Sequence, residues 1–460
     1  MKPWVTEFLL TMLQKFHSLA GLVFVIFLNS LSTGAFAGDT LSIGWSSVDI
    51  TPENSAMMRG GIRSTGVLDP ITATVLALES SDESAGSSNR FILVSCDRQH
   101  ITDGNRYPAN MLGDVRALAS RAVPEIEPNQ IILMATHTHV APSVQADPEY
   151  LKFASGKIAA GIEQAWKARR PGGISFGLGH AVTGHNRIAT YTDGKSRMSG
   201  SFQKGSTGNK AFSHLEGIED HSVHLLYTWD LQKKLTGVIV NIACPAQVQR
   251  GDKLSADFWH EAREMIRESL GADVHILPQL SAAGDIGTTV MVEKKAERRM
   301  QNLMFPDEAD DRKIRRLQIG KNISEAVISV LPLTRTTIDF APTLGHQQEI
   351  IPLTAGFPEP KKDTKPDFPV EINAVRLGEV AFVTNPFEFY LDYGMRIKGR
   401  SPATQTFVVQ LTGSASYLPT EKAVSAGGYG AIPKTCVIGP AAGTRIVETS
   451  LELLEKLWSE

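Results

Sequence analysis

The sequence contains little cysteine and no strong excess of charge of either sign, and both features narrow the classes of protein to which it can belong. Cys96, Cys244 and Cys436 are far apart and odd in number, so they form neither a disulfide framework nor a zinc-ribbon spacing. The formal net charge is only −3, which argues against nucleic acid as a partner. Apolar residues make up 42% of the chain, enough for a real core, so stability must come from packing.

Long hydrophobic runs are also scarce, and the longest lies near the N-terminus. Two lysines precede the run Leu19–Leu28, and Ala35-Phe36-Ala37 offers a small-x-small cleavage site. The run is about half the ~20 residues that span a bilayer, which favours a signal peptide over an uncleaved anchor. We therefore expect a signal peptide at residues 1–37, cleaved after Ala37, and a secreted or periplasmic mature chain without a transmembrane segment.

Beyond the signal peptide the chain alternates between short segments rich in β-branched and aromatic residues and longer segments with helical character. The expected strands are Leu41–Ile50, Ile71–Leu78, Phe91–Cys96, Ile131–Thr136, Ile174–Leu178, Val223–Trp229 and Leu235–Ala243. The expected helices are Asn110–Arg121, Pro148–Arg169, Phe258–Leu270, Asp310–Val330, Phe387–Lys398 and Thr444–Trp458. This mixture predicts an α/β (α+β) domain in which a layered mixed sheet is flanked by helices.

The strongest local motif is Ala135-Thr136-His137-Thr138-His139, directly after an apolar strand. If the strand continues, side chains two apart share a face, so His137 and His139 point the same way. Two imidazoles at a strand's end suit a metal site, or a metal ligand beside an acid/base. The alternative is a pair of surface or core histidines with no ligand.

Three further positions have both a functional and a purely structural interpretation. Glu388 opens the helix expected at Phe387–Lys398, where it either interacts with the helix dipole or faces a cleft. Asp285 follows a tight turn of small residues, so it either orients a histidine or caps the turn. His260 lies in the first turn of the expected helix Phe258–Leu270, from which a side chain can reach a pocket.

Taken in order, these pieces resemble the catalytic domain of the neutral and alkaline ceramidases. The resemblance begins at Gly44–Pro52, which is similar to the family's opening G-x-x-x-x-D-I-T-P. Ala135–His139 resembles its A-T-H-T-H segment, and Asn385–Glu388 resembles its P-x-E carboxylate. Tyr417 and Tyr429 recur at the spacing of its tyrosine pair. The match covers most of residues 38–460, which we expect to form one ceramidase-like catalytic domain.

The resemblance implies a catalytic Zn²⁺ bound by His137, Glu388 and Tyr417. It also implies that His139 lies beside the water that the zinc activates.

The resemblance further implies that Tyr429 holds the substrate or its tetrahedral intermediate. Asn186-Arg187 is similar to the family's N-R pair, whose arginine reaches the site. We therefore expect Arg187 and Tyr429 to be catalytic, with Asp285 orienting a histidine, and Asn186 and Tyr429 to bind substrate.

The sequence departs from the family at two places. Pro245 stands where the family has a zinc-binding histidine, and proline cannot be a ligand. We expect His260 to replace it, with Cys244 or a weakened metal site as the alternatives. The family's G-D-x-S-P segment is also broken, because Gly287 and Thr288 follow Asp285-Ile286, so a serine role there is lost or passes to Thr288.

The leading hypothesis is therefore a zinc-dependent amide hydrolase of an N-acyl substrate, with a ceramide-like lipid as the default. We also expect this chain to differ from full-length ceramidases in length, because their immunoglobulin-like C-terminal domain is expected to be absent after Glu460. The alternatives are a metal-dependent hydrolase of an ester or carbohydrate-derived substrate, and a non-catalytic binding protein. The expected partner is a small-molecule or lipid substrate, with peripheral contact at a membrane surface as a further expectation.

Overall fold

The protein is described by a computed structural model that covers residues 40–82 and 87–459. The predicted signal peptide at residues 1–37 lies outside these described residues. Within them, no helix is both long enough and apolar enough to cross a membrane. Cys96, Cys244 and Cys436 are buried as free thiols, in keeping with a fold that is held together by packing.

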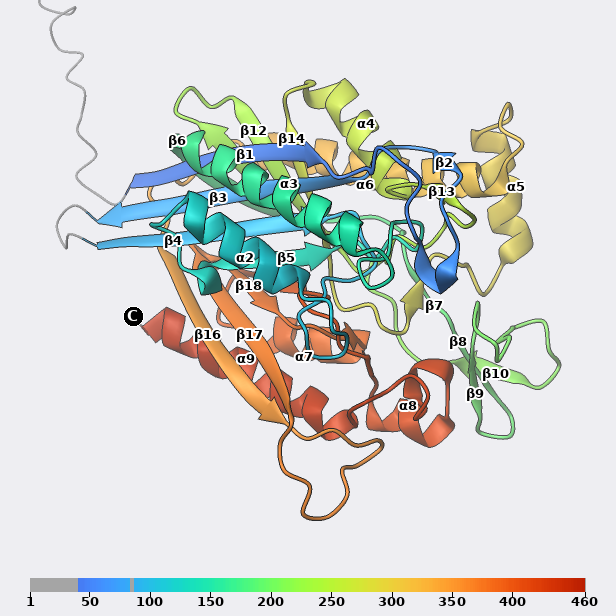
Figure 1. The fold of residues 1–460 in the computed structure, drawn as a ribbon. Helices are drawn as coiled ribbons and strands as arrows, with labels where there is room; N and C mark the ends of the chain where they lie inside the picture. The colour runs from blue at the N-terminus through green and yellow to red at the C-terminus, as the bar shows by residue number, and fades with distance from the viewer. Residues whose placement is uncertain (1–39, 83–86, 460) are drawn as a thin grey trace, which may run out of the picture. The chain divides into compact units, whose positions relative to one another are not determined.

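The largest element is a mixed sheet of eight strands in the order β14-β12-β11-β6-β1-β3-β4-β5 (Figure 1). Neighbours pair antiparallel except β4 with β5 and β12 with β14, which are parallel. The strands are β1 (Thr40–Asp49), β3 (Thr72–Asp82), β4 (Ser87–Cys96), β5 (Ile131–Ala135), β6 (Arg170–His180), β11 (Ser222–Asp230), β12 (Leu235–Ile242) and β14 (His275–Leu280).

A second sheet of four strands packs against one face of the first. Its strands are β16 (Leu344–Leu353), β17 (Phe368–Leu377), β18 (Val380–Thr384) and β20 (Gln405–Val409), in that order. Alternate residues of the two sheets, such as Leu93 and Phe91 from β4 and Phe382 from β18, form one apolar core between them. Strands such as β5 therefore bury both faces, which explains the continuous apolar sequence of β5.

Helices cover the outer face of both sheets and complete a layered helix–sheet–sheet–helix arrangement. Figure 1 shows α2 and α3 over the blue strands β3 and β4, and α9 along the orange strands β16 and β17. The helices are α2 (Met111–Ala122), α3 (Pro148–Lys167), α4 (Phe258–Leu270), α5 (Lys294–Met304), α6 (Asp311–Thr334), α7 (Leu391–Arg400), α8 (Glu421–Ala426) and α9 (Pro440–Ser459). The predicted class, a layered mixed sheet flanked by helices, is confirmed.

Short strands and 3₁₀ turns form the loops that surround the site. The strands are β2 (Gly66–Val67), β7 (His185–Asn186), β8 (Ile188–Tyr191), β9 (Ser196–Met198), β10 (Phe212–Leu215), β13 (Lys253–Leu254), β15 (Ile286–Gly287), β19 (Glu388–Phe389) and β21 (Tyr417–Leu418). The 3₁₀ turns are η1 (Arg59–Gly61), η2 (Pro128–Gln130) and η3 (Tyr429–Ala431). The pair β19 and β21 is parallel and places Glu388 directly beside Tyr417.

Two local expectations differ from the structure. The helix expected from Phe387 begins only at Leu391, so Glu388 lies in a strand and has no helix dipole to satisfy. Strand β5 ends at Ala135, and His137 has a left-handed backbone with φ of 69°. Strand alternation therefore does not explain how the two motif histidines come together. A turn does.

Candidate active site

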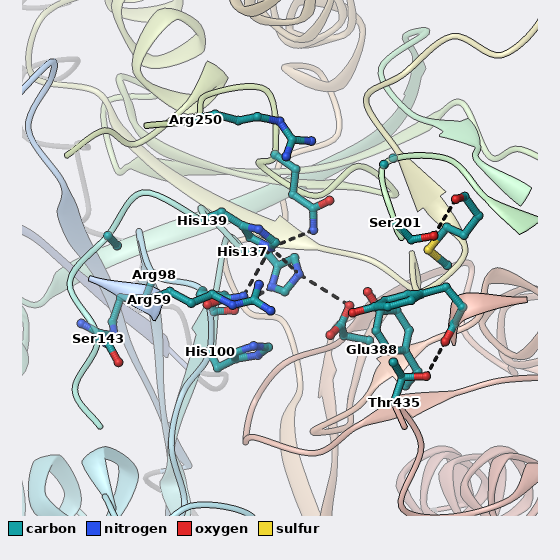
Figure 2. A pocket seen from close by; sticks show the side chains of 18 of the residues that line it. Arg59, Arg98, His100, His137, His139, Ser143, Ser201, Arg250, Glu388 and Thr435 are labelled. Carbon is teal, nitrogen blue, oxygen red and sulfur yellow. Dashed lines mark hydrogen bonds and ion pairs between the residues drawn. The ribbon is translucent and has the colours of Figure 1, made fainter. Parts of the chain in front are cut away.

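A cavity of about 550 Å³ lies where the loops after β4, β5 and β12 meet the segments β19 and β21. The loops are tied together by backbone hydrogen bonds, including Ala246 N to the Thr136 carbonyl at 3.1 Å. Six predicted site residues line the cavity: His137, His139, Arg187, Glu388, Tyr417 and Tyr429. Figure 2 shows His137, His139 and Glu388 facing one another across it.

The orientation of His137 is fixed by the backbone of the neighbouring loop. Its Nδ1 lies 2.7 Å from the Gln99 carbonyl, and because a carbonyl only accepts, Nδ1 carries the proton. In the neutral ring, Nε2 therefore presents a lone pair to the cavity. Positive φ in a non-glycine residue costs energy and is concentrated at functional sites, so the turn at His137 is consistent with a functional role.

Glu388 is buried opposite His137, with Oε2 at 3.6 Å from Nε2. Burial alone would raise the pKa of Glu388, but its hydrogen bond and charge interaction with His137 outweigh burial and hold the pKa below its ordinary value. The backbone here is closely packed, since a Cβ on Gly284 would lie 2.5 Å from the Glu388 carbonyl oxygen. The carboxylate is thus ionised and held at a fixed position.

His139 lies beside His137, with 3.3 Å between the two Nε2 atoms. Its Nε2 also lies within reach of two side-chain amides, Gln247 at 3.1 Å and Gln99 at 3.4 Å, both of which can donate to it. Burial, followed by the charge of His137, lowers the pKa of His139 well below its ordinary value. The imidazole is therefore a neutral base.

His100 is a third imidazole in the cavity, and no motif pointed to it. Its ring lies edge-on to His137 with 5.1 Å between ring centroids, and its buried Nδ1 has no hydrogen-bond partner among the described residues. Burial and the charge of His137 lower its pKa to about 3. The signal that could have found it is the polar run Asp97–His100 at the end of β4, beside the parallel strand β5.

Arg187 lines the cavity and connects two other residues of its lining. Its two terminal nitrogens donate to the Gln247 side-chain oxygen at 3.2 Å and to the Tyr417 hydroxyl at 3.3 Å. The Tyr417 ring stands edge-on to Tyr429 at 5.8 Å. Burial and the neighbouring Glu388 charge raise the pKa of Tyr417, so its phenol remains protonated.

Asn186 and Asp285 lie behind the cavity wall. The Asn186 amide donates to Asp285 at 3.0 Å, and Asp285 also accepts the backbone N–H of Leu391 at 2.8 Å. The backbone N–H of Arg187 bonds to the Asp285 carbonyl at 3.1 Å. The two residues therefore fix the loop that carries Arg187, which is a positioning role, while Thr288 does line the cavity.

The two replacements expected for the lost histidine are not brought to the site. His260 lies in the first turn of α4, outside the cavity lining, where its N–H bonds to the Asp257 carbonyl. Cys244 is buried behind the loop, with its thiol directed to the Thr183 carbonyl, and burial raises its pKa to about 12. Of the three imidazoles that the cavity does hold, two belong to the His137 motif and the third is His100.

Two distances from His137 are close to the separation of neighbouring ligands around a metal ion. Ligands about 2.0–2.1 Å from a tetrahedral ion lie about 3.3–3.4 Å apart, and His137 Nε2 lies 3.3 Å from His139 Nε2 and 3.6 Å from Glu388. When the two Nε2 atoms carry no proton, they and the Glu388 carboxylate offer electron pairs to the same part of the cavity. Within residues 40–82 and 87–459, however, no group of three histidine, cysteine, aspartate or glutamate side chains forms a metal site by itself. Tyr417 lies beside Glu388 in the neighbouring strand.

Comparison with proteins of known structure identifies the fold of the chain. No protein-family model matches the chain, and no curated protein does. The neutral ceramidase from Pseudomonas aeruginosa superposes with a TM-score of 0.69 at 15% identity, over 91% of this chain and 75% of that one. A ceramidase complexed with C2 matches with the same TM-score and coverage at 14% identity. The chain therefore has the ceramidase fold, and the predicted resemblance is confirmed at that level.

Proposed function

We propose that the protein is a zinc-dependent hydrolase that cleaves the amide bond of an N-acyl substrate. The observation that carries this proposal is that His137 and Glu388 face each other, 3.6 Å apart, in one cavity with His139 beside them. The ceramidase fold supports it, because the solved structures with this fold are named as ceramidases.

The residues of the cavity suit amide hydrolysis. A zinc ion held by His137, Glu388 and Tyr417 would polarise the substrate carbonyl and lower the pKa of a water molecule to about 7. His139, neutral and adjacent, accepts the proton of the attacking water and delivers it to the leaving nitrogen. Arg187, which donates to the Tyr417 hydroxyl at 3.3 Å, would stabilise the oxyanion. Water adds to the carbonyl carbon, the C–N bond breaks, and a fatty acid and an amine are released.

His100 is our choice for the ligand that Pro245 cannot supply. Its Nδ1 is buried without a hydrogen-bond partner among the described residues, and its ring lies against His137 in the cavity. An unpartnered buried nitrogen is costly unless something binds it. His260, which the sequence favoured, has no such access.

Elemental analysis of the purified protein tests this assignment. We expect about one zinc per chain in the wild type and at least a tenfold loss in His137→Ala, since even outer-shell changes cost about 10–100-fold in affinity. His100→Ala should also lose metal, whereas His260→Ala is the matched control and should keep it. Metal retained in His137→Ala, with folding unchanged by circular dichroism, would contradict the site.

Two other parts of the proposal have their own measurements. Release of fatty acid from N-acyl amines, but not from matched esters or sugar derivatives, separates an amidase from the other hydrolase class. Ligand binding without turnover by the zinc-loaded protein would instead favour the binding-protein alternative. Export rests on Leu19–Leu28 and the Ala35-Phe36-Ala37 site, and N-terminal sequencing of the mature protein should begin at Gly38.

A further inference from the structure

The charge around the cavity differs from that of the whole chain. The chain has a formal net charge of −3. The described residues that line the cavity nevertheless include several cations and one carboxylate, Glu388. The cations are Arg59, Arg98, Arg106, Arg187, Arg250 and Lys434.

None of these cations forms an ion pair within the part of the chain that the structure describes. Arg98 is the clearest case, because it is 2% exposed. One of its terminal nitrogens donates to the Pro142 carbonyl at 3.1 Å, while Nε and Nη1 have no partner. Its guanidinium also lies 5.2 Å from the ring centroid of Tyr150. A buried guanidinium that meets no anion is unfavourable by itself.

The other cations surround the proposed reacting centre on several sides. Figure 2 shows Arg59 and Arg98 on one wall of the pocket and Arg250 on another. Arg59 lines the same cavity as His139. Arg187 donates to Tyr417, beside Glu388. The positive charge therefore lines the same cavity as the proposed reacting centre, and Arg187 contacts one of its residues.

A neutral substrate would leave the buried guanidinium of Arg98 without an anion. A ceramide has no ionised group next to its amide, whereas a carboxylate or phosphate would accept from the planar guanidinium groups, often in bidentate fashion. We infer that the natural substrate is an N-acyl compound with an oxyanion close to the amide, such as an N-acyl amino acid. The inference rests on the proposed amide hydrolysis and specifies its substrate. The bond broken is the same C–N bond, and the leaving amine carries the oxyanion.

Matched substrates test the inference with the zinc-loaded protein. N-lauroylglycine and N-lauroylglycinamide differ in charge but hardly in shape. We expect kcat/KM to be at least about tenfold higher for the glycine conjugate, because a charge-assisted hydrogen bond contributes about that factor or more. N-lauroyl-O-phosphoethanolamine against N-lauroylethanolamine repeats the comparison with a phosphate, and N-lauroylsphingosine represents ceramide. A preference limited to one anion identifies the source of the oxyanion.

Variants of two exposed cavity arginines show whether these residues recognise the charge of the substrate. Arg59→Gln and Arg250→Gln, both at exposed positions, should raise KM for N-lauroylglycine several-fold, and by more than they raise KM for the glycinamide. Arg63→Gln is the matched control: it lies four residues from Arg59, is exposed, and is outside the cavity lining. The preference should also shrink as salt is raised.

Calorimetric binding separates this inference from the proposed function. Equal kcat/KM for glycine conjugate and glycinamide, or a preference for N-lauroylsphingosine, would overturn the anionic substrate and leave the hydrolase intact. If no amide is cleaved but N-lauroylglycine binds and glycinamide does not, the hydrolase fails and the anion site stands. Binding that is unchanged in both Arg59→Gln and Arg250→Gln would overturn the assignment of the site to these residues.

Discussion

Asp97 and Arg98 are consecutive residues at the end of β4, and their charges meet opposite surroundings. Asp97 is fully buried and accepts two hydrogen bonds from Arg263, at 2.7 and 3.1 Å. Arg98 is almost as buried but meets no carboxylate among the described residues. The same contrast holds more widely, because the core residue Arg316 meets both Asp69 and Glu261.

This difference separates charged residues that stabilise the fold from charged residues that are available to bind a ligand. Buried ions survive when they are paired and hydrogen-bonded, as Arg263 and Arg316 are. A site built for a ligand must leave groups unsatisfied, so it is held at a cost in stability that the rest of the fold offsets. On this basis we propose that the buried cavity residue Arg98 serves a ligand, whereas the paired core residues Arg263 and Arg316 stabilise the fold.

The largest effect should come from breaking a core pair. Arg263→Met removes the partner of Asp97 and leaves a buried carboxylate, which should lower the free energy of unfolding by about 3–5 kcal/mol. The measurement is urea denaturation of the metal-free protein. Adding Asp97→Asn to this variant should recover much of the loss, because the stranded charge is then gone. A loss below about 1 kcal/mol in the single variant would mean that the pair is not structural.

Much of this architecture was accessible from the sequence, while its long-range parts were not. Composition and periodicity predicted a layered mixed sheet with helices, and the motif order pointed to the correct fold. The second sheet was missed as a unit, because pairing of β16 with β17 depends on partners distant in the sequence. Local patterns report which residues are apolar and do not report which strand they meet.

The site shows the same limit. His137 and Glu388 were predicted as neighbours by resemblance, but each was placed on the wrong element. A turn with positive φ brings His137 beside His139, and a two-residue strand holds Glu388. His100 was missed because no motif includes it, and only the parallel pairing of β4 with β5 brings it to the site.

The comparison of paired and unpaired buried charges extends to a buried acid whose carboxylate forms no ion pair among the described residues. Glu216 is 5% exposed, and Lys422 contacts only its backbone carbonyl. Burial, followed by the charge of Asp285, raises its pKa from 4.5 to about 7. Between these values the folded protein holds a proton that the unfolded chain has lost. This contribution to stability therefore falls as pH rises from about 4.5 to about 7, and is flat above.

Glu216→Gln should remove that slope. The variant should match the wild type in free energy of unfolding near pH 4.5 and exceed it by about 2–3 kcal/mol at pH 8, the order expected for such a shift. Urea denaturation at several pH values gives the difference directly. A constant difference across the range would mean that Glu216 keeps its ordinary pKa in the fold.

The smallest expected change in stability is also the most direct test of the comparison. Arg98→Met keeps the apolar stem and removes a buried charge that has no anion, so the loss of its bond to Pro142 is largely offset by relief of desolvation. We expect the free energy of unfolding to change by less than about 1 kcal/mol, against the much larger loss in Arg263→Met. The same variant should bind N-lauroylglycine at least about tenfold more weakly. If Arg98→Met instead unfolds the protein as Arg263→Met does, the two kinds of arginine are not distinct, and the unpaired charge belongs to the fold.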